Sequence, residues 1–192
     1  MKKIVLSLLG VFFLCAVAGA QTVRNVTAEF GKDAMRPAYS MPFDCSRKIV
    51  EEALQKRLKK DKIKGKSFSG MMLYQKVNNS QLGVQNCNLY TKVESVGKKS
   101  NLYFFIEREN GNFVTTGDAE ESSVMKYMES LTADVAALQQ KYDVNSQKKV
   151  YEKAEKEYQK LISQQKKLDK KIQKADAERQ EQKTILEELQ KQ

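Results

Sequence analysis

The last third of the chain, residues 119–192, contains neither glycine nor proline. It consists mainly of Ala, Glu, Lys, Gln and Leu, which are all good helix formers. Apolar residues recur there in alternating steps of three and four, the heptad pattern of a helix that buries one stripe against another helix. A first series runs from Val124 to Tyr142. The second series, called the seam below, comprises Tyr151, Ala154, Tyr158, Leu161, Leu168 and Ile172.

The two series do not share one heptad register, because the phase slips by two residues around 143–146. Either the helix breaks there, with Asn145 or Ser146 capping a second helix, or it continues with a local change of winding. Propensity alone stabilises a long isolated helix poorly. We therefore expect the seam to pair, either folded back on the first series or with another copy of the chain. Polar residues occupy three core positions of its register: Gln165, Arg179 and Gln182.

The first 20 residues have the layout of a signal peptide. Lys2 and Lys3 form a positive start, residues 4–17 are apolar, and Ala18-Gly19-Ala20 is the small-x-small pattern that a signal peptidase cleaves. The apolar run is shorter than the roughly 20 residues of a membrane-spanning helix. We expect cleavage after Ala20, a periplasmic or secreted product, and no transmembrane segment after the signal is removed.

Residues 21–118, between the signal segment and the helical tail (119–192), predict a small α+β domain. Extended segments at 22–30 and 38–41 precede a helix that Asp44 or Ser46 can cap, with Glu51 and Glu52 in its early turns. Further strands are predicted at 67–77, with Gly70 as a bulge or a point of close approach, at 87–96 with one wet face, at 102–106, and at 113–116 after an Asn110-Gly111 hairpin signal.

Residues 102–106 are apolar on both faces, which is typical of a central strand. The expected fold class is therefore α+β, with a small antiparallel sheet, one packed helix, and a long C-terminal helical or coiled-coil segment. A signal segment before Gln21, one helix, strands such as Met72-Leu73-Tyr74 and 102–106, and then a long charged helix form a recognisable layout. This layout resembles a group of exported proteins of unknown function from Bacteroidota-type bacteria. The resemblance covers the whole chain and implies no activity.

Composition argues against several classes of enzyme. The chain has no histidine, so the commonest general base, metal ligand and pH switch are all missing. No glycine-rich phosphate loop, Cys/His cluster or carboxylate pair at a recognisable spacing occurs in it. We therefore expect a non-enzymatic protein with no catalytic residue, no metal and no cofactor.

The positive charge lies mainly in the predicted domain. Residues 21–118 hold 17 basic and 10 acidic residues, a net charge of +7, whereas residues 119–192 hold 15 and 14. This field favours an anionic partner, such as an acidic envelope component. The alternative is a solvated helix end where cations complement the helix dipole. Nucleic acid is not expected, because export and the lack of interleaved aromatics argue against it. The basic run comprises Lys56, Arg57, Lys59, Lys60, Lys62, Lys64 and Lys66.

Cys45 and Cys87 are the two cysteines that follow the signal segment. In an oxidising compartment they could form a disulfide between the helix and the sheet. They could equally remain unpaired and pack as small hydrophobic residues. A reactive thiol at the helix N-terminus is a third alternative, but no partner base accompanies it.

Three functions follow from these features. The first is an envelope protein that scaffolds or binds a partner through its coiled coil. The second is a periplasmic holdase, because small size, basic charge and long helices resemble Skp-type chaperones; in that family, however, the helical arm is inserted within the chain. The third is binding of anionic lipid or cell-wall polymer through the basic domain.

Overall fold

The computed structural model of the protein describes residues 22–31 and 34–190. The predicted signal segment, 1–20, and its cleavage site lie outside these residues. The chain divides into two compact units between Gln139 and Gln140. We call the described part of the first unit the head. The predicted division at residue 118 rested on composition, whereas the head extends to Gln139, because the start of the long helix belongs to its core.

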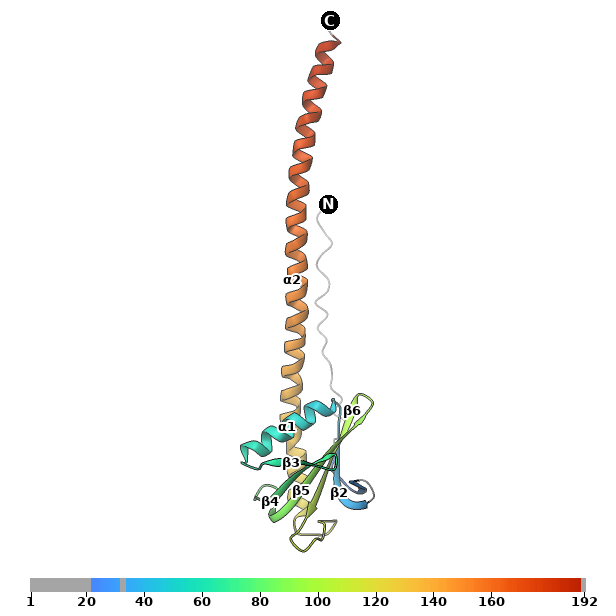
Figure 1. The fold of residues 1–192 in the computed structure, drawn as a ribbon, viewed down its shortest axis with the longest axis vertical. Helices are drawn as coiled ribbons and strands as arrows, with labels where there is room; N and C mark the ends of the chain where they lie inside the picture. Colours follow the sequence, from blue (N-terminus) through green and yellow to red (C-terminus); the bar gives the residue numbers. More distant parts are fainter. Residues whose placement is uncertain (1–21, 32–33, 191–192) are drawn as a thin grey trace. The chain divides into compact units, whose positions relative to one another are not determined.

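The head contains one six-stranded antiparallel sheet and helix α1, so the predicted α+β class is confirmed (Figure 1). The strands pair in the order β1-β2-β6-β5-β4-β3. Strand β6 is central, as the apolar residues of its two faces predicted. The elements are β1 (Arg24–Phe30), β2 (Ala34–Phe43), α1 (Arg47–Lys60), β3 (Gly65–Phe68), β4 (Met71–Asn79), β5 (Val84–Val96), β6 (Lys99–Glu107) and α2 (Glu121–Leu189).

The predicted single strand at 67–77 is wrong, because a hairpin turn divides this segment into β3 and β4. Phe68 pairs directly with Met71, which leaves Ser69 and Gly70 as a two-residue loop. Both loop residues have positive φ, of 45° and 78°, the backbone that matches the twist of a tight hairpin. Gly70 is therefore a turn residue, and neither a bulge nor a point of close approach. Strand β3 begins at Gly65.

The predicted return strand at 113–116 is also wrong. Asn110 and Gly111 form a turn, but the segment after it makes only an isolated bridge, from Phe113 to Glu107. The chain then turns away toward α2, where Thr115 N–H donates to the Asp118 carboxylate at 2.7 Å. The Asn110-Gly111 pair, which predicted a hairpin, therefore forms a turn that no second strand follows.

Helix α1 begins where it was predicted to begin, but not for the predicted reason. Ser46 is the N-cap residue, yet its side chain makes no capping hydrogen bond, and the first turn carries no acidic residue. Glu51 and Glu52 lie further along and form ion pairs one turn away, with Arg47 at 2.7 Å and Lys56 at 2.6 Å. Such exposed pairs contribute only tenths of a kcal/mol each.

The main core of the head lies between one face of the sheet and two helices. From β6, Leu102 and Phe104 are fully buried here, together with Leu54 and Leu58 of α1. The Phe104 ring lies 6.3 Å from the ring of Tyr127, which belongs to the start of α2. The α2 residues in this core are Val124, Tyr127, Met128, Leu131, Val135 and Leu138.

The opposite face of the sheet carries a second, smaller core, so the prediction of one wet face along β5 holds only in part. Tyr90 lies on this face and is only 7% exposed. It packs with Phe105 and Met71, and the Phe30 ring covers it edge-on at 4.8 Å. Lys92, on the same side of β5, borders a groove described below.

Candidate functional site

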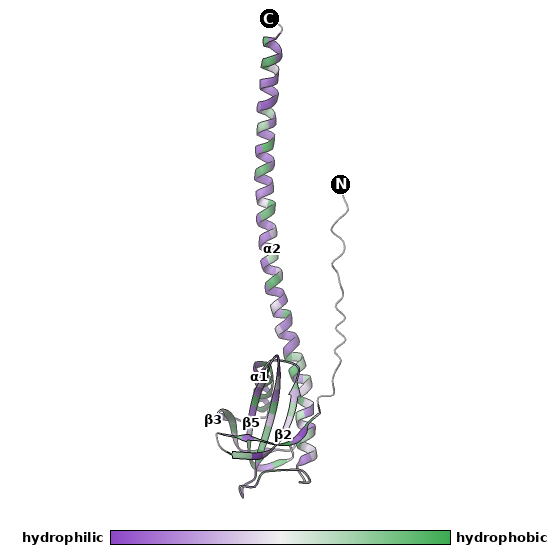
Figure 2. Ribbon diagram, turned by 90° about the vertical axis from the view of Figure 1, so that its right-hand side faces the viewer, coloured by the Kyte–Doolittle hydropathy of each residue, from purple (hydrophilic) through white to green (hydrophobic). Residues whose placement is uncertain are grey.

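The seam lies on the part of α2 that forms the second compact unit, Gln140–Gln192. Hydrophobic positions recur along this helix between hydrophilic ones (Figure 2). Tyr151 is 68% exposed and Leu161 62% exposed, and the remaining seam residues are exposed as well. Helix α2 runs without a break through 143–146, so of the two alternatives the structure has the continuous helix.

The first apolar series of the helix is not available to the seam. Its apolar residues from Val124 to Leu138 are buried in the head, against α1 and the sheet, whereas its last member, Tyr142, is exposed. The predicted alternative in which the seam folds back on this series is therefore wrong, because α1 and the sheet already cover its buried residues. The phase slip near residue 143 follows the last buried residue of α2. Among the described residues, the seam thus has no apolar surface packed on it.

The basic run does not form one uniform surface, because Arg57 is a structural residue. Its side chain is 18% exposed. Its guanidinium donates to the Asp134 carboxylate at 2.6 Å, and to the hydroxyl and carbonyl oxygens of Ser130 at 2.6 and 2.8 Å. It also lies over the Tyr127 ring, 5.4 Å from its centre. Burial and nearby Asp61 raise the pKa of Tyr127, which stays a neutral phenol. Arg57 therefore fastens α1 to the start of α2.

Five lysines of the basic run remain exposed and form no ion pair within the described residues. Lys62 is unusual among them, because its φ of 61° lies in the left-handed region that favours glycine. It closes α1 in a Schellman turn, in which Ile63 N–H donates to the Leu58 carbonyl at 2.8 Å. Lys56 instead pairs with Glu52. The five exposed lysines are Lys59, Lys60, Lys62, Lys64 and Lys66.

Cys45 and Cys87 are separate free thiols, both buried, so the bridge considered from the sequence is not formed. The sheet explains why. The Cys45 carbonyl accepts a hydrogen bond from Ser100, which pairs with Ser95 at one end of β5. Cys87 lies near the other end of β5, about 27 Å away at the usual rise per residue. A disulfide needs α-carbons within about 7 Å of each other.

The same burial makes a reactive thiol unfavourable. Burial raises the pKa of Cys45, and the carboxylate of Asp44 raises it further. Burial also raises the pKa of Cys87, whose S–H donates to the Gln85 carbonyl at 3.2 Å. Both side chains therefore act as small hydrophobic residues at neutral pH.

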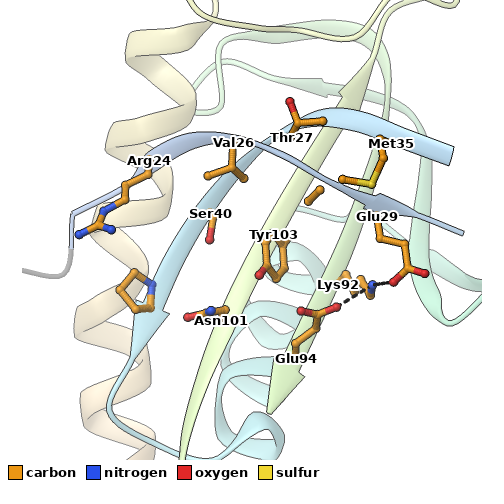
Figure 3. A pocket seen from close by; sticks show the side chains of 12 residues that line it. Arg24, Val26, Thr27, Glu29, Met35, Ser40, Lys92, Glu94, Asn101 and Tyr103 are labelled. Atoms are coloured by element: carbon orange, nitrogen blue, oxygen red, sulfur yellow. Dashed lines mark hydrogen bonds and ion pairs between the residues drawn. The ribbon is translucent and has the colours of Figure 1, made fainter. Parts of the chain in front are cut away.

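A groove that was not predicted from the sequence lies on the outer face of the sheet, next to the smaller core (Figure 3). The groove has a volume of about 770 Å³, and strands β1, β2, β5 and β6 contribute to it. Lys92 borders it, and its amine pairs with Glu94 at 2.6 Å and Glu29 at 3.1 Å. Polar side chains at alternate positions of β5 and β6 were the only signal of it, because a groove depends on how strands from distant segments pair.

The Lys92 amine in the groove is not a reactive nucleophile. Burial lowers the pKa of Lys92, but the two carboxylates outweigh this effect and raise the pKa above its ordinary value. The amine is therefore protonated and cannot serve as a nucleophile at neutral pH. Tyr103 and Asn101 offer polar contacts beside it, and Met35 and Val26 offer apolar ones. The lining mixes both charges with apolar patches and does not select one class of ligand.

The described residues contain no group of three or more Cys, Asp or Glu side chains arranged to hold a metal ion. None of the described helices has the length and apolar character needed to cross a bilayer. No protein-family model matches the chain, and comparison with curated proteins finds no match. The resemblance to exported bacterial proteins therefore stays a prediction.

Proposed function

We propose that this is an exported, non-enzymatic interaction protein, in which a small α+β head carries a helix that binds a second protein chain. One observation carries the proposal. The seam keeps heptad spacing over 151–172, yet its large side chains are between 51% and 68% exposed. The first apolar series of the same helix is buried in the head from Val124 to Leu138, so the described residues offer no second helix to cover the seam.

The energetics favour a partner. Burying a Leu or Ile side chain contributes about 1.5–3 kcal/mol relative to leaving it in water. A helix as long as α2 gains little from propensity alone, and its exposed ion pairs, such as Lys174 with Glu178 at 3.6 Å, add only tenths of a kcal/mol. An apolar stripe repeated every heptad is what helix–helix pairing uses.

The test is sedimentation of the purified protein over a range of concentrations, combined with affinity capture from its native envelope. We expect a concentration-dependent assembly, or a captured protein whose binding is lost when seam leucines become aspartate. A protein that stays monomeric at all concentrations and captures nothing in a seam-dependent way would contradict the proposal.

A second candidate function is binding of an anionic envelope surface through the five exposed lysines. The observation that favours it is Lys62, a lysine held in a left-handed backbone conformation where glycine would be less strained. Four further lysines lie within a few residues of it, and none forms an ion pair within the described part of the chain. Such a cluster attracts anions through a field that salt screens.

Replacing Lys59, Lys60, Lys62 and Lys64 with Gln is expected to weaken binding to vesicles of anionic phospholipid by more than tenfold. Each lysine near an anionic surface contributes about 1 kcal/mol. The measurement is vesicle co-sedimentation at low and high salt, with neutral vesicles as reference.

A matched control removes the same charge from four lysines of the second unit. Binding that is insensitive to salt, or that both variants lose equally, would rule out a site at the end of α1. The control lysines are Lys160, Lys166, Lys167 and Lys170.

A further inference from the structure

We infer that the occupant of the seam is a second copy of this chain, which lies parallel to the first and in register with it. This inference rests on the proposed function and adds the identity and direction of the partner. The heptad that places Tyr151 at position a and Ala154 at position d continues through Leu186 and Leu189. The stripe from 151 to 189 spans about 57 Å at 1.5 Å per residue.

The polar core positions favour parallel pairing. In a parallel in-register pair, every residue at a or d meets its own counterpart. Gln165 then meets Gln165 and Gln182 meets Gln182, so each amide can donate to and accept from another amide. Antiparallel pairing over the same stripe sets Gln182 against Tyr158. It leaves polar groups buried against apolar side chains, which is unfavourable.

Arg179 is the one charged residue at a core position of this stripe, and its environment offsets the repulsion between two copies. The Asp176 carboxylate lies 3.3 Å from the Arg179 guanidinium in the same helix. Glu178, at the neighbouring g position, adds a second negative charge beside it. Antiparallel pairing would instead set Arg179 against Leu161.

The flanking charges point the same way. In a parallel pair, position g of one heptad lies beside position e of the partner's next heptad, and these residues set orientation. Lys171 then lies beside Asp176, and Glu178 beside Lys183, so both contacts join opposite charges and each occurs twice. Antiparallel pairing over 151–189 joins Glu155 to Lys183 near the two ends, but at its centre it places Asp169 beside Asp169 and Lys171 beside Lys171. It therefore brings like charges together on both flanks.

Ion pairs within one helix do not prevent these side chains from contacting the second copy. Glu178 lies 3.6 Å from Lys174, and Lys183 lies 3.8 Å from Glu187, at the long end of the range for ion pairs. These side chains are more than half exposed. Exposed pairs one turn apart contribute little, so the same side chains are free to turn toward a neighbouring helix.

Disulfide trapping tests direction and register. In the full chain, Ala154→Cys places a thiol at position d, where the two α-carbons of a parallel in-register pair lie within disulfide range. We expect a reducible covalent dimer under mild oxidation. Lys156→Cys, at the outward position f, is the matched control and should give none. Antiparallel pairing sets Ala154 against Leu186, so Ala154→Cys alone would not cross-link.

A charge exchange gives an independent readout. Lys171→Glu places like charges at two contacts of the dimer and should weaken self-association about tenfold, measured by sedimentation. Adding Asp176→Lys restores opposite charges at these contacts but removes the carboxylate beside Arg179. The exchange is therefore made together with Arg179→Gln, and it should return the affinity to within about threefold of that of the Arg179→Gln protein. Lys170→Glu, which makes the same charge change at position f, should leave self-association unchanged.

The outcomes separate this inference from the proposed function. A dimer in sedimentation that Ala154→Cys fails to trap, or that the charge exchange fails to restore, overturns parallel in-register pairing but keeps the seam as an interface. A monomer that captures a different protein through the seam overturns the inference that a second copy occupies the seam, but it keeps the proposed function. A monomer without seam-dependent binding overturns both.

Discussion

Replacing Leu131 with Ala is expected to lower the free energy of unfolding of the head by about 3 kcal/mol. The same replacement at Leu161 should change it by less than about 0.5 kcal/mol. Both leucines belong to heptad series of one helix, but Leu131 is fully buried in the head and Leu161 is 62% exposed. Replacing Leu131 removes buried apolar surface and leaves a cavity in the core of the head. Replacing Leu161 removes a side chain that is already mostly in water, so the head loses nothing.

Chemical denaturation followed by near-ultraviolet circular dichroism measures this difference. The tyrosine signal comes mainly from side chains buried in the head, among them Tyr39, Tyr74 and Tyr127. Measurements at low protein concentration keep association through the seam from contributing. Equal destabilisation by the two replacements would show that the start of α2 does not belong to the core of the head.

Replacing both Leu161 and Leu168 with Asp is expected to weaken assembly through the seam by more than 100-fold. Each leucine loses about 1.5–3 kcal/mol of burial in every copy, and each aspartate adds a charge that the interface cannot solvate. The head should keep its near-ultraviolet spectrum, because neither residue belongs to its core. Sedimentation equilibrium of the parent and the variant gives the ratio of the association constants.

The matched control for this variant makes the same chemical change away from the seam. Gln159→Asp with Gln173→Asp adds two negative charges and two residues of lower helix propensity at outward positions of the heptad. This control should associate as the parent does, within about threefold. If it loses assembly to the same degree, the effect comes from charge or helix propensity and not from the seam.

The sequence was informative wherever the chemistry is local. Alternation and apolar runs identified most strands, and β6 was correctly placed at the centre because both of its faces are apolar. The segment without Gly or Pro forms one long helix. The errors were also local in origin: Ser69 with Gly70 was not recognised as a turn, and Asn110-Gly111 suggested a strand after it that does not form.

The candidate surfaces needed the fold, because their members lie far apart in the chain. Arg57 appears in the sequence as one cation of seven, and only the position of Asp134 distinguishes it from its neighbours. Cys45 and Cys87 are separated by the length of β5, which their spacing in the sequence does not reveal. The groove beside Lys92 is formed by four strands from both ends of the domain.

The amino-acid sequence by itself determined that two apolar stripes follow each other on one helix-forming segment and that each needs a partner. Only the tertiary structure decided that the stripe from Val124 to Leu138 is covered by α1 and the sheet, while the one from Tyr151 to Ile172 is not. The physical reason is that the hydrophobic effect is not directional. A heptad pattern shows that a surface must be buried, and the packing of distant segments decides what buries it.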